Sequence, residues 1–100
     1  MDFAYLEGFA AGDKTVIAEV LALFVEQAAL WRVRLAAPGA DWSDLVHTIK
    51  GASRGIGAAM LGDISERAEQ GGPEGLGEVL AALDEALSAI AAYSASTRSV

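Results

Sequence analysis

Apolar residues recur three or four positions apart along nearly the whole of this 100-residue chain. This spacing is typical of amphipathic helices, whose apolar side chains line one face. The longest series consists of Ile17, Val20, Leu21, Phe24, Ala28, Trp31 and Leu35. Asp13 is suited to cap the start of this helix, and Pro38 followed by Gly39 is suited to end it. We therefore predict a helix over residues 13–37.

Three further helices are predicted by the same spacing and by residues that start or stop helices. Asp41 suits an N-cap, and Pro73 suits the first turn of a helix. The paired glycines Gly71 and Gly72 separate the last two helices. The predicted helices cover residues 41–56, 59–70 and 73–96. The apolar residues that mark these helices are Trp42, Leu45, Ile49, Ala52 and Ile56, then Met60, Leu61, Ile64 and Ala68, then Leu76, Leu80, Leu83, Leu87 and Ile90.

The remaining N-terminal residues predict one more, shorter helix. An apolar stretch runs from Phe3 to Phe9 and ends near Gly12. The loops between the four long helices are too short for anything except antiparallel packing of neighbours. No segment alternates with period two for long enough to form a strand, and no internal repeat or linker is visible. The expected fold is all-α: an antiparallel four-helix bundle with a short extra N-terminal helix, a single domain over residues 1–100 that closes its core as a monomer.

The composition excludes several classes of function. The hydrophobic fraction of 53% owes much to alanine, and the formal net charge of -7 disfavours nucleic acid and anionic membranes as partners. The chain has no cysteine, which excludes disulfides, thiol catalysis and cysteine zinc sites. No apolar run approaches the roughly 18 residues of a membrane span. No basic segment of a secretory signal opens the chain. We therefore expect a cytoplasmic protein with no membrane partner.

His47 is the only histidine in the chain and lies within the third predicted helix. Read at about 100° per residue, it falls opposite the apolar stripe, on one face with Lys50, Gly51 and Arg54. Neutral imidazole is a good nucleophile near pH 7. Cations one and two turns away would stabilise an anionic phosphoryl group during its transfer. The plain alternative for these four residues is a solvated helix face without chemistry.

Gly51 argues against that plain alternative. A glycine inside a helix costs about 1 kcal/mol relative to alanine. Gly51 follows His47 by one turn on the exposed face, where core packing gives no reason for a small residue. Its missing side chain would open one flank of the imidazole to a docking partner. Gly55 and Gly57, in contrast, lie where the helix should end, and helix termination explains them.

A resemblance to a known family rests on one run of residues. The run is His47-Thr48-Ile49-Lys50-Gly51-Ala52-Ser53, followed by Ile56-Gly57-Ala58 and Leu61. It resembles the histidine-containing phosphotransfer (HPt) domain, whose pattern is histidine, any residue, leucine or similar, lysine, glycine and two small residues, then apolar-glycine-alanine. Asp13 before the long helix that contains Phe24, and the paired glycines before the last helix, also fit the layout of that family.

The resemblance implies an intermediate of a two-component phosphorelay. His47 would accept a phosphoryl group from the aspartate of a receiver domain, or from a hybrid histidine kinase, and pass it to the aspartate of another receiver. The receiver of a response regulator would supply the aspartate and Mg²⁺, so this chain would need no metal, nucleotide or other cofactor. Lys50 would assist the transfer, and Gly51 and Arg54 would contact the receiver.

One more site residue is implied on the fourth predicted helix. In the family, a polar side chain of the helix that follows often holds the imidazole. Glu69 and Gln70 both lie at about the right distance from His47 in the sequence. The spacing leaves this choice open by one residue, and Gln70 is taken as the candidate.

The glycines admit a competing interpretation. The run from Gly51 to Gly57 also resembles the glycine-rich turn of short-chain dehydrogenases, where glycines let a strand-to-helix turn approach a dinucleotide pyrophosphate. That motif should follow a first strand and open a much longer domain of repeated βα units. Here it follows two helices, and the residue four positions after Tyr93 is Thr97 rather than the lysine of that family. The surroundings therefore disfavour a dehydrogenase.

Two helical alternatives remain. A non-catalytic adaptor or dimerisation module would account for the bundle and the acidic surface, but not for the arrangement around His47. The dimerisation hairpin of a histidine kinase also presents a histidine on a helix. It normally has an acidic residue beside that histidine and an ATP-binding domain after it. Val46 and Thr48 flank His47, and this chain contains no such domain.

Overall fold

The computed structural model describes residues 1–37 and 41–98, and these residues form helices without any strand. The predicted stop at Pro38 and Gly39 lies outside the described residues. The other predicted boundaries agree with the structure to within three residues, and the last helix is preceded by a short 3-10 turn. The elements are α1 (Phe3–Phe9), α2 (Lys14–Ala36), α3 (Trp42–Gly55), α4 (Ala59–Gly71), η1 (Pro73–Gly75) and α5 (Leu76–Arg98).

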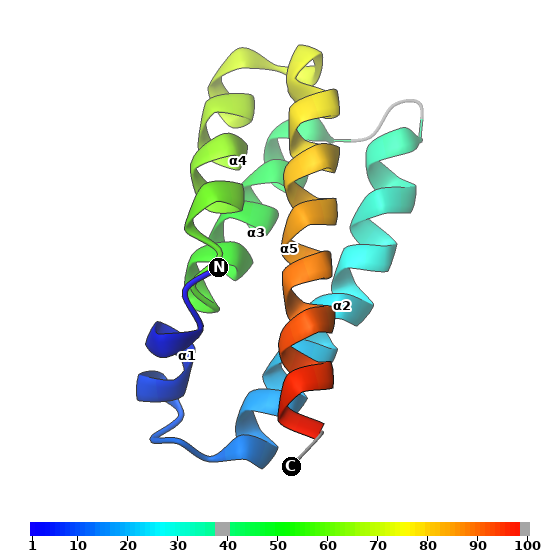
Figure 1. Cartoon of the computed structure of the whole chain (residues 1–100). Helices are drawn as coiled ribbons and strands as arrows, with labels where there is room; N and C mark the ends of the chain where they lie inside the picture. Colours follow the sequence, from blue (N-terminus) through cyan, green and yellow to red (C-terminus); the bar gives the residue numbers. More distant parts are fainter. Residues whose placement is uncertain (38–40, 99–100) are drawn as a thin grey trace.

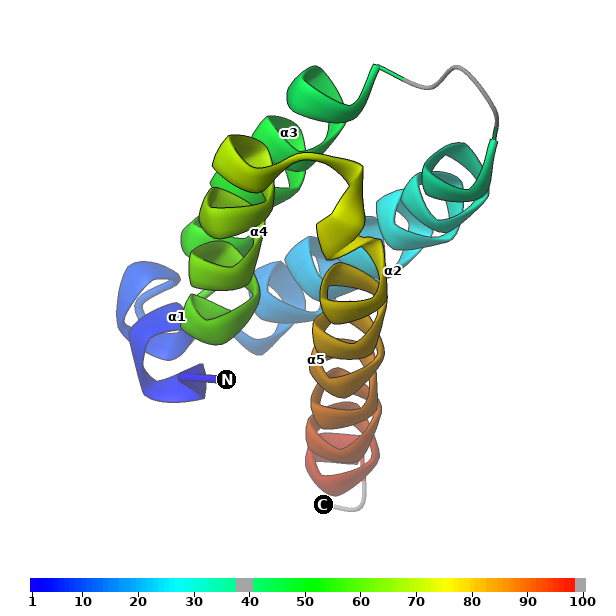
Figure 2. The ribbon, with the colours of Figure 1, turned by 90° about the horizontal axis from the view of Figure 1, so that it is seen from above.

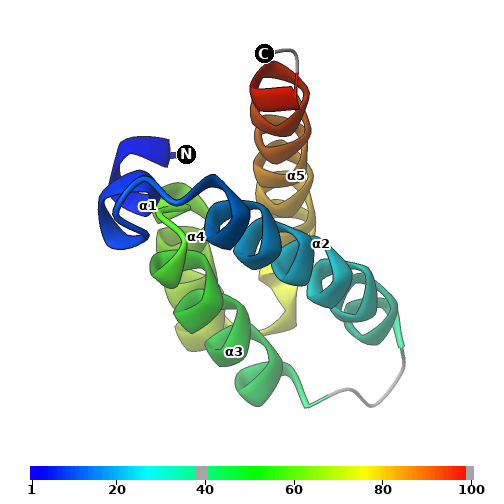
Figure 3. The ribbon, with the colours of Figure 1, turned by 90° about the horizontal axis from the view of Figure 1, so that it is seen from below.

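The four long helices run alternately up and down and form an antiparallel bundle, which confirms the predicted fold (Figure 1). Seen along the bundle, α3 and α4 lie side by side, and α5 and α2 complete the ring (Figure 2). The short helix α1 packs at the end of the bundle where α3 ends and α4 begins (Figure 3). The fold therefore places α3 between α2 and α4, with one face open to solvent.

Side chains and glycines set the helix ends as the sequence predicts. The Asp13 carboxylate accepts hydrogen bonds from two backbone N–H groups in the first turn of α2. The Asp41 carboxylate accepts one from the backbone N–H of Asp44 at the start of α3. Gly57 and Gly72 end α3 and α4 with φ values of +82° and +88°, a backbone conformation that glycine adopts without strain. These caps fix where the bundle turns.

The core contains most of the predicted apolar residues, and Phe24 and Trp31 of α2 meet edge to face with ring centroids 5.4 Å apart. Met60, one of the apolar residues that mark α4, is 61% exposed in the first turn of that helix. On α5, small side chains are more deeply buried than several of the leucines, and small side chains let the helices approach closely. The fully or nearly buried residues there are Val79, Ala82, Leu83, Ala86 and Ile90, while Leu76, Leu80 and Leu87 are half-buried.

Contacts with the core, with α5 and with the turn after α3 fix α1 to the bundle. Leu6 is buried in the core. Phe3 stacks on Tyr93 of α5, with ring centroids 4.2 Å apart and planes inclined by 7°. The backbone N–H of Asp2 donates a hydrogen bond of 2.9 Å to the carbonyl of Gly57. Helix α1 therefore joins the turn after α3 to the last helix of the bundle.

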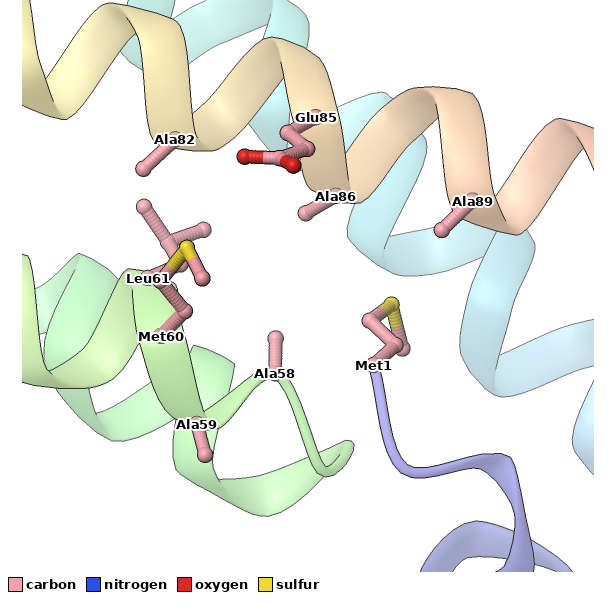
Figure 4. Close-up of a pocket in the computed structure, with 9 residues that line it drawn as sticks. All are labelled: Met1, Ala58, Ala59, Met60, Leu61, Ala82, Glu85, Ala86 and Ala89. Atoms are coloured by element: carbon pink, nitrogen blue, oxygen red, sulfur yellow. The ribbon is translucent and has the colours of Figure 1, made fainter.

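A small, mostly apolar hollow lies between α4 and α5. Alanines form most of its wall, and Met1, Met60, Leu61 and Glu85 complete it (Figure 4). His47 is not among the residues that line it. Among the described residues, no helix is long and apolar enough to cross a membrane.

Candidate functional site

His47 projects from the open face of α3. Its neighbours Val46 and Ile49 turn toward the core and are fully buried, whereas 66% of the His47 side chain is exposed. This contrast follows from the helical periodicity, which turns residues 46 and 49 away from the direction of residue 47. The structure therefore leaves the imidazole accessible, as the sequence predicts.

A carboxylate on the neighbouring helix holds the imidazole. Oε2 of Glu69, on α4, lies 2.9 Å from Nδ1 of His47. The other oxygen of the same carboxylate, Oε1, accepts a hydrogen bond of 2.8 Å from Nζ of Lys50. Glu69 therefore links the histidine and the lysine of α3 through its two oxygens. Since only 18% of the Lys50 side chain and 24% of the Glu69 side chain are exposed, this link is sheltered from water.

The charge of Glu69 determines which nitrogen of His47 carries the proton. The hydrogen bond from Lys50 lowers the pKa of the Glu69 carboxyl, so that it is ionised at neutral pH. An ionised carboxylate only accepts hydrogen bonds, so Nδ1 of His47 must donate. In neutral imidazole the lone pair is then on Nε2, the ring nitrogen that is not bound to Glu69. The site thus presents an unprotonated nitrogen on an exposed side chain.

A second carboxyl lies one turn before His47. The pKa of Asp44 is raised, chiefly because its carboxyl shares a hydrogen bond with that of Asp41 and because the two charges repel. Both side chains are exposed at the start of α3. Neither is among the hydrogen-bond partners found for His47, whose contact is with Glu69. The first turn of α3 therefore adds negative charge near the imidazole without holding it.

The packing of α3 on α4 explains why Glu69 reaches His47. The stem of Arg54 lies over Gly62, where a Cβ atom would come within 2.9 Å of Cγ of Arg54. His47 is seven residues before Arg54, and Glu69 is seven residues after Gly62. When two residues face each other across antiparallel helices, the residue two turns before the first also faces the residue two turns after the second. The close approach at Gly62 therefore sets the register that pairs Glu69 with His47.

Both cations of the predicted site are paired with carboxylates of α4. Lys50 binds Glu69, and the Arg54 guanidinium lies 3.4 Å from Asp63 and 3.3 Å from Glu66. The sequence places these cations beside the histidine on α3, and the structure shows that they also lie along the seam between α3 and α4. Their charge is therefore held in place rather than mobile around the imidazole.

The opposite flank of His47 is open. Gly51 is exposed, and a Cβ atom built on it would meet no other atom within 4 Å. Close helix packing therefore does not explain the glycine. Beyond it, α2 carries large apolar side chains that are more than half exposed, including Leu23 at 57% and Leu30 at 55%. The side of α2 that packs on α5 is marked by the ion pair between Arg32 and Asp84, and Leu23 and Leu30 lie on the flank away from it.

The residue assigned to hold the imidazole was wrong by one position. Gln70 was the candidate, but Glu69 makes the contact with His47. Gln70 is exposed, and at about 100° farther around α4 its side chain leaves in a different direction. Sequence spacing allowed both residues, because the loop between two helices does not fix how far one is rotated against the other. The charge of Glu69, which suits both His47 and Lys50, was the available signal for the right choice.

The described part of the chain contains no cluster of side chains suited to bind a metal ion. No group of three or more histidine, cysteine, aspartate or glutamate residues is arranged to hold a metal ion there. What residues 1–37 and 41–98 do offer is one accessible imidazole with a carboxylate behind it. This arrangement suits attack on a group that is presented from outside by another molecule.

Comparisons with known proteins agree with this geometry. Residues 19–93 match a family model described as the Hpt domain. The structure is similar to the crystal structure of the histidine phosphotransferase ShpA from Caulobacter crescentus, with 58% sequence identity and a TM-score of 0.87. That similarity covers 97% of this chain and 92% of the other. A comparison with curated proteins gives no match.

Proposed function

Because the chain belongs to the Hpt domain family, whose members act as histidine phosphotransfer proteins in phosphorelays, we propose that His47 is the residue that carries the phosphoryl group. The observation that carries this proposal is the bond between Nδ1 of His47 and Glu69, which leaves the lone pair on Nε2. The partners are receiver domains of response regulators, or the receiver of a hybrid histidine kinase. The chain acts as a monomer in the cytoplasm under this proposal.

The transfer step uses Nε2 as the nucleophile. Its lone pair attacks the phosphorus of an aspartyl phosphate, an N–P bond forms, and the P–O bond to the aspartate breaks. The aspartate leaves as a carboxylate with the electron pair of that bond. Nδ1 keeps its proton throughout, and the positive charge that develops on the ring is stabilised by Glu69, 2.9 Å away. In the reverse direction a second receiver aspartate attacks phosphorus, and Nε2 regains the electron pair.

Lys50 has a separate role in this proposal. Its ammonium group carries three N–H donors, one of which goes to Glu69. A phosphoryl group on Nε2 lies within about one helical turn of this ammonium, so the remaining donors can stabilise the charged oxygens. Lys50→Ala should therefore leave receiver binding nearly unchanged and lower the rate of transfer. Binding by calorimetry and transfer by rapid quench measure the two effects independently.

The docking face is the open side of α3. The bare backbone at Gly51 lets a receiver approach the imidazole closely, and Leu23 and Leu30 of α2 extend the face with apolar surface. Arg54 lies two turns beyond His47 at the other end of the face. Apolar and arginine side chains of this kind are common at the centres of protein interfaces. A contact of Gln70 with the receiver stays a prediction.

The experiment is incubation of the chain with phosphorylated receiver domains. The expected product carries phosphate that is labile in acid and stable in base, as a phosphohistidine is. His47→Gln should fold with nearly the stability of the parent, because an exposed side chain contributes little packing, and it should accept no phosphate. Phosphate on the His47→Gln chain would falsify the assignment. A large loss of stability in that variant would instead indicate that His47 has a structural role.

A further inference from the structure

Helix α1 lies outside the segment that matches the Hpt family. The match begins at residue 19, whereas α1 covers Phe3–Phe9. The helix still carries two large aromatic side chains that the core does not use. Tyr5 is 50% exposed and Phe9 is 72% exposed, and their separation of four residues places them on one face of α1. Single exposed apolar residues are common on protein surfaces, whereas neighbouring exposed aromatic residues often mark a site of interaction.

Other residues of α1 provide contacts that attach the helix to the bundle. Leu6 is buried, Phe3 stacks on Tyr93, and the backbone of Asp2 is hydrogen-bonded to Gly57. These contacts use the faces of α1 that point toward the bundle. They fix α1 firmly, so that Tyr5 and Phe9 are presented on a rigid support. A rigid aromatic side chain loses little conformational entropy when a partner covers it.

Tyr5 is continuous with the face of α3 that carries His47. The Tyr5 ring lies against Gly57, at 3.3 Å from the position a Cβ atom would occupy there. Tyr5 and Gly57 also line a common hollow with Arg54. Arg54 follows His47 by seven residues, which is about 10 Å along the helix axis. Tyr5 therefore extends the face of His47 beyond the end of α3, and Phe9 lies one turn farther along the same side of α1.

A receiver that binds at His47 is expected to be large enough to contact α1 as well. A stable interface covers about 800 Å² on each partner, which corresponds to a disc of about 16 Å radius. A receiver centred on His47 would cover Arg54 and reach the Tyr5 ring beside it. Tyrosine is among the residue types that most often contribute a large part of the binding energy when a partner covers them.

We propose that Tyr5 and Phe9 form a second contact for the receiver domain and help to select which receiver exchanges phosphate with this chain. This inference rests on the proposed function and names a specificity surface for it. The partner surface would be an apolar patch at the edge of the receiver interface, away from the phosphorylated aspartate, since two rings without a formal charge form the contact. The two rings touch neither His47 nor Glu69, so they act on binding and not on the chemical step.

The test compares Phe9→Ala and Tyr5→Ala with the parent chain. Purified receiver domains from the same organism, phosphorylated with acetyl phosphate, serve as donors. The receiver that transfers fastest to the parent is then used throughout. The expected result is a rise in KM for the phosphorylated receiver of roughly tenfold in each variant, with the rate at saturation unchanged. Val25→Ala is the matched control, because Val25 is an exposed apolar residue on the flank of α2 that faces α5.

A small phosphate donor distinguishes a failure of the proposed phosphotransfer function from a failure of the inference about α1. Phosphoramidate should phosphorylate His47 equally in the parent and in all three variants, because it needs no docking surface. If the parent accepts phosphate from phosphoramidate but from no receiver, the proposed function fails. If receivers serve the parent and both α1 variants with the same KM, only the inference about α1 is overturned. A dimeric parent that Phe9→Ala converts to a monomer at unchanged KM would also overturn it, by assigning the surface to a second copy.

Discussion

Glu69 and His47 lie on different helices, yet Oε2 of the carboxylate is 2.9 Å from Nδ1 of the imidazole. This pairing turns an exposed histidine into a side chain with a defined tautomer and a counter-charge. The second oxygen of Glu69 binds Lys50 at 2.8 Å, so one carboxylate positions both residues of the site. Removing it should affect catalysis more than folding.

Glu69→Ala should lower the rate of transfer from a phosphorylated receiver by roughly tenfold, because the proton of His47 is then free to move to Nε2. Glu69→Gln should retain more activity, since its amide oxygen can still accept from Nδ1. The nitrogen chemical shifts of His47 report the tautomer directly. Gln70→Ala is the matched control and should leave the tautomer as in the parent. An unchanged tautomer in Glu69→Ala would show that Glu69 does not position the ring.

The same carboxylate should make part of the stability dependent on pH. Lys50 holds the pKa of Glu69 below its ordinary value, so the folded state favours the ionised form. The resulting stabilisation is fully present above the unfolded pKa of about 4.3 and is lost as the pH falls through the lower folded pKa. The difference in free energy of unfolding between the parent and Glu69→Gln should therefore be larger at pH 7 than at pH 3, and it should shrink as the pH falls below about 4.3. Urea titrations at pH 7 and pH 3 measure it, and a difference that grows in acid would contradict the assignment.

Substitutions at Gly51 should separate folding from docking. Gly51→Ala should keep or raise the free energy of unfolding, by up to about 1 kcal/mol, because the site is helical and a Cβ atom there meets nothing within 4 Å. Gly51→Gln should also fold, but its longer side chain should block the approach of a receiver to the imidazole. Chemical denaturation and receiver binding measure the two effects. Transfer to Gly51→Gln at the parent rate would place the docking face elsewhere.

Two neighbouring glycines should respond oppositely to the same substitution. Gly57→Ala should destabilise the chain by about 1–3 kcal/mol, because an L-residue is strained at positive φ. The added Cβ atom would also lie 2.6 Å from the carbonyl oxygen of Asp2. Gly55→Ala is the control: the residue is helical and has free space around it, so the variant should gain up to about 1 kcal/mol. Thermal melts of both variants compare them, and equal effects would refute this account of the turn.

The sequence by itself determined the helices and the exposed face of the site. Regular apolar spacing, the caps at Asp13 and Asp41 and the glycines between helices are local signals, because each acts through residues within one or two turns. They predicted an all-α bundle and placed His47 and Gly51 on the solvent side of α3. The spacing of the motif was enough to indicate the family, since its residues lie close together in α3, the turn after it and the first turn of α4.

The tertiary structure decided which residues meet across helices. Gln70 was chosen over Glu69 because a periodic pattern does not fix the rotation of one helix against its neighbour. That rotation is set by close packing, here by the stem of Arg54 over Gly62, which carries Glu69 to His47 two turns away. The pairing of Lys50 and Arg54 with α4 and the attachment of α1 beside Gly57 depend on the same packing. Contacts between distant segments are determined by how side chains fill the space between helices, and that is settled only when the whole chain is folded.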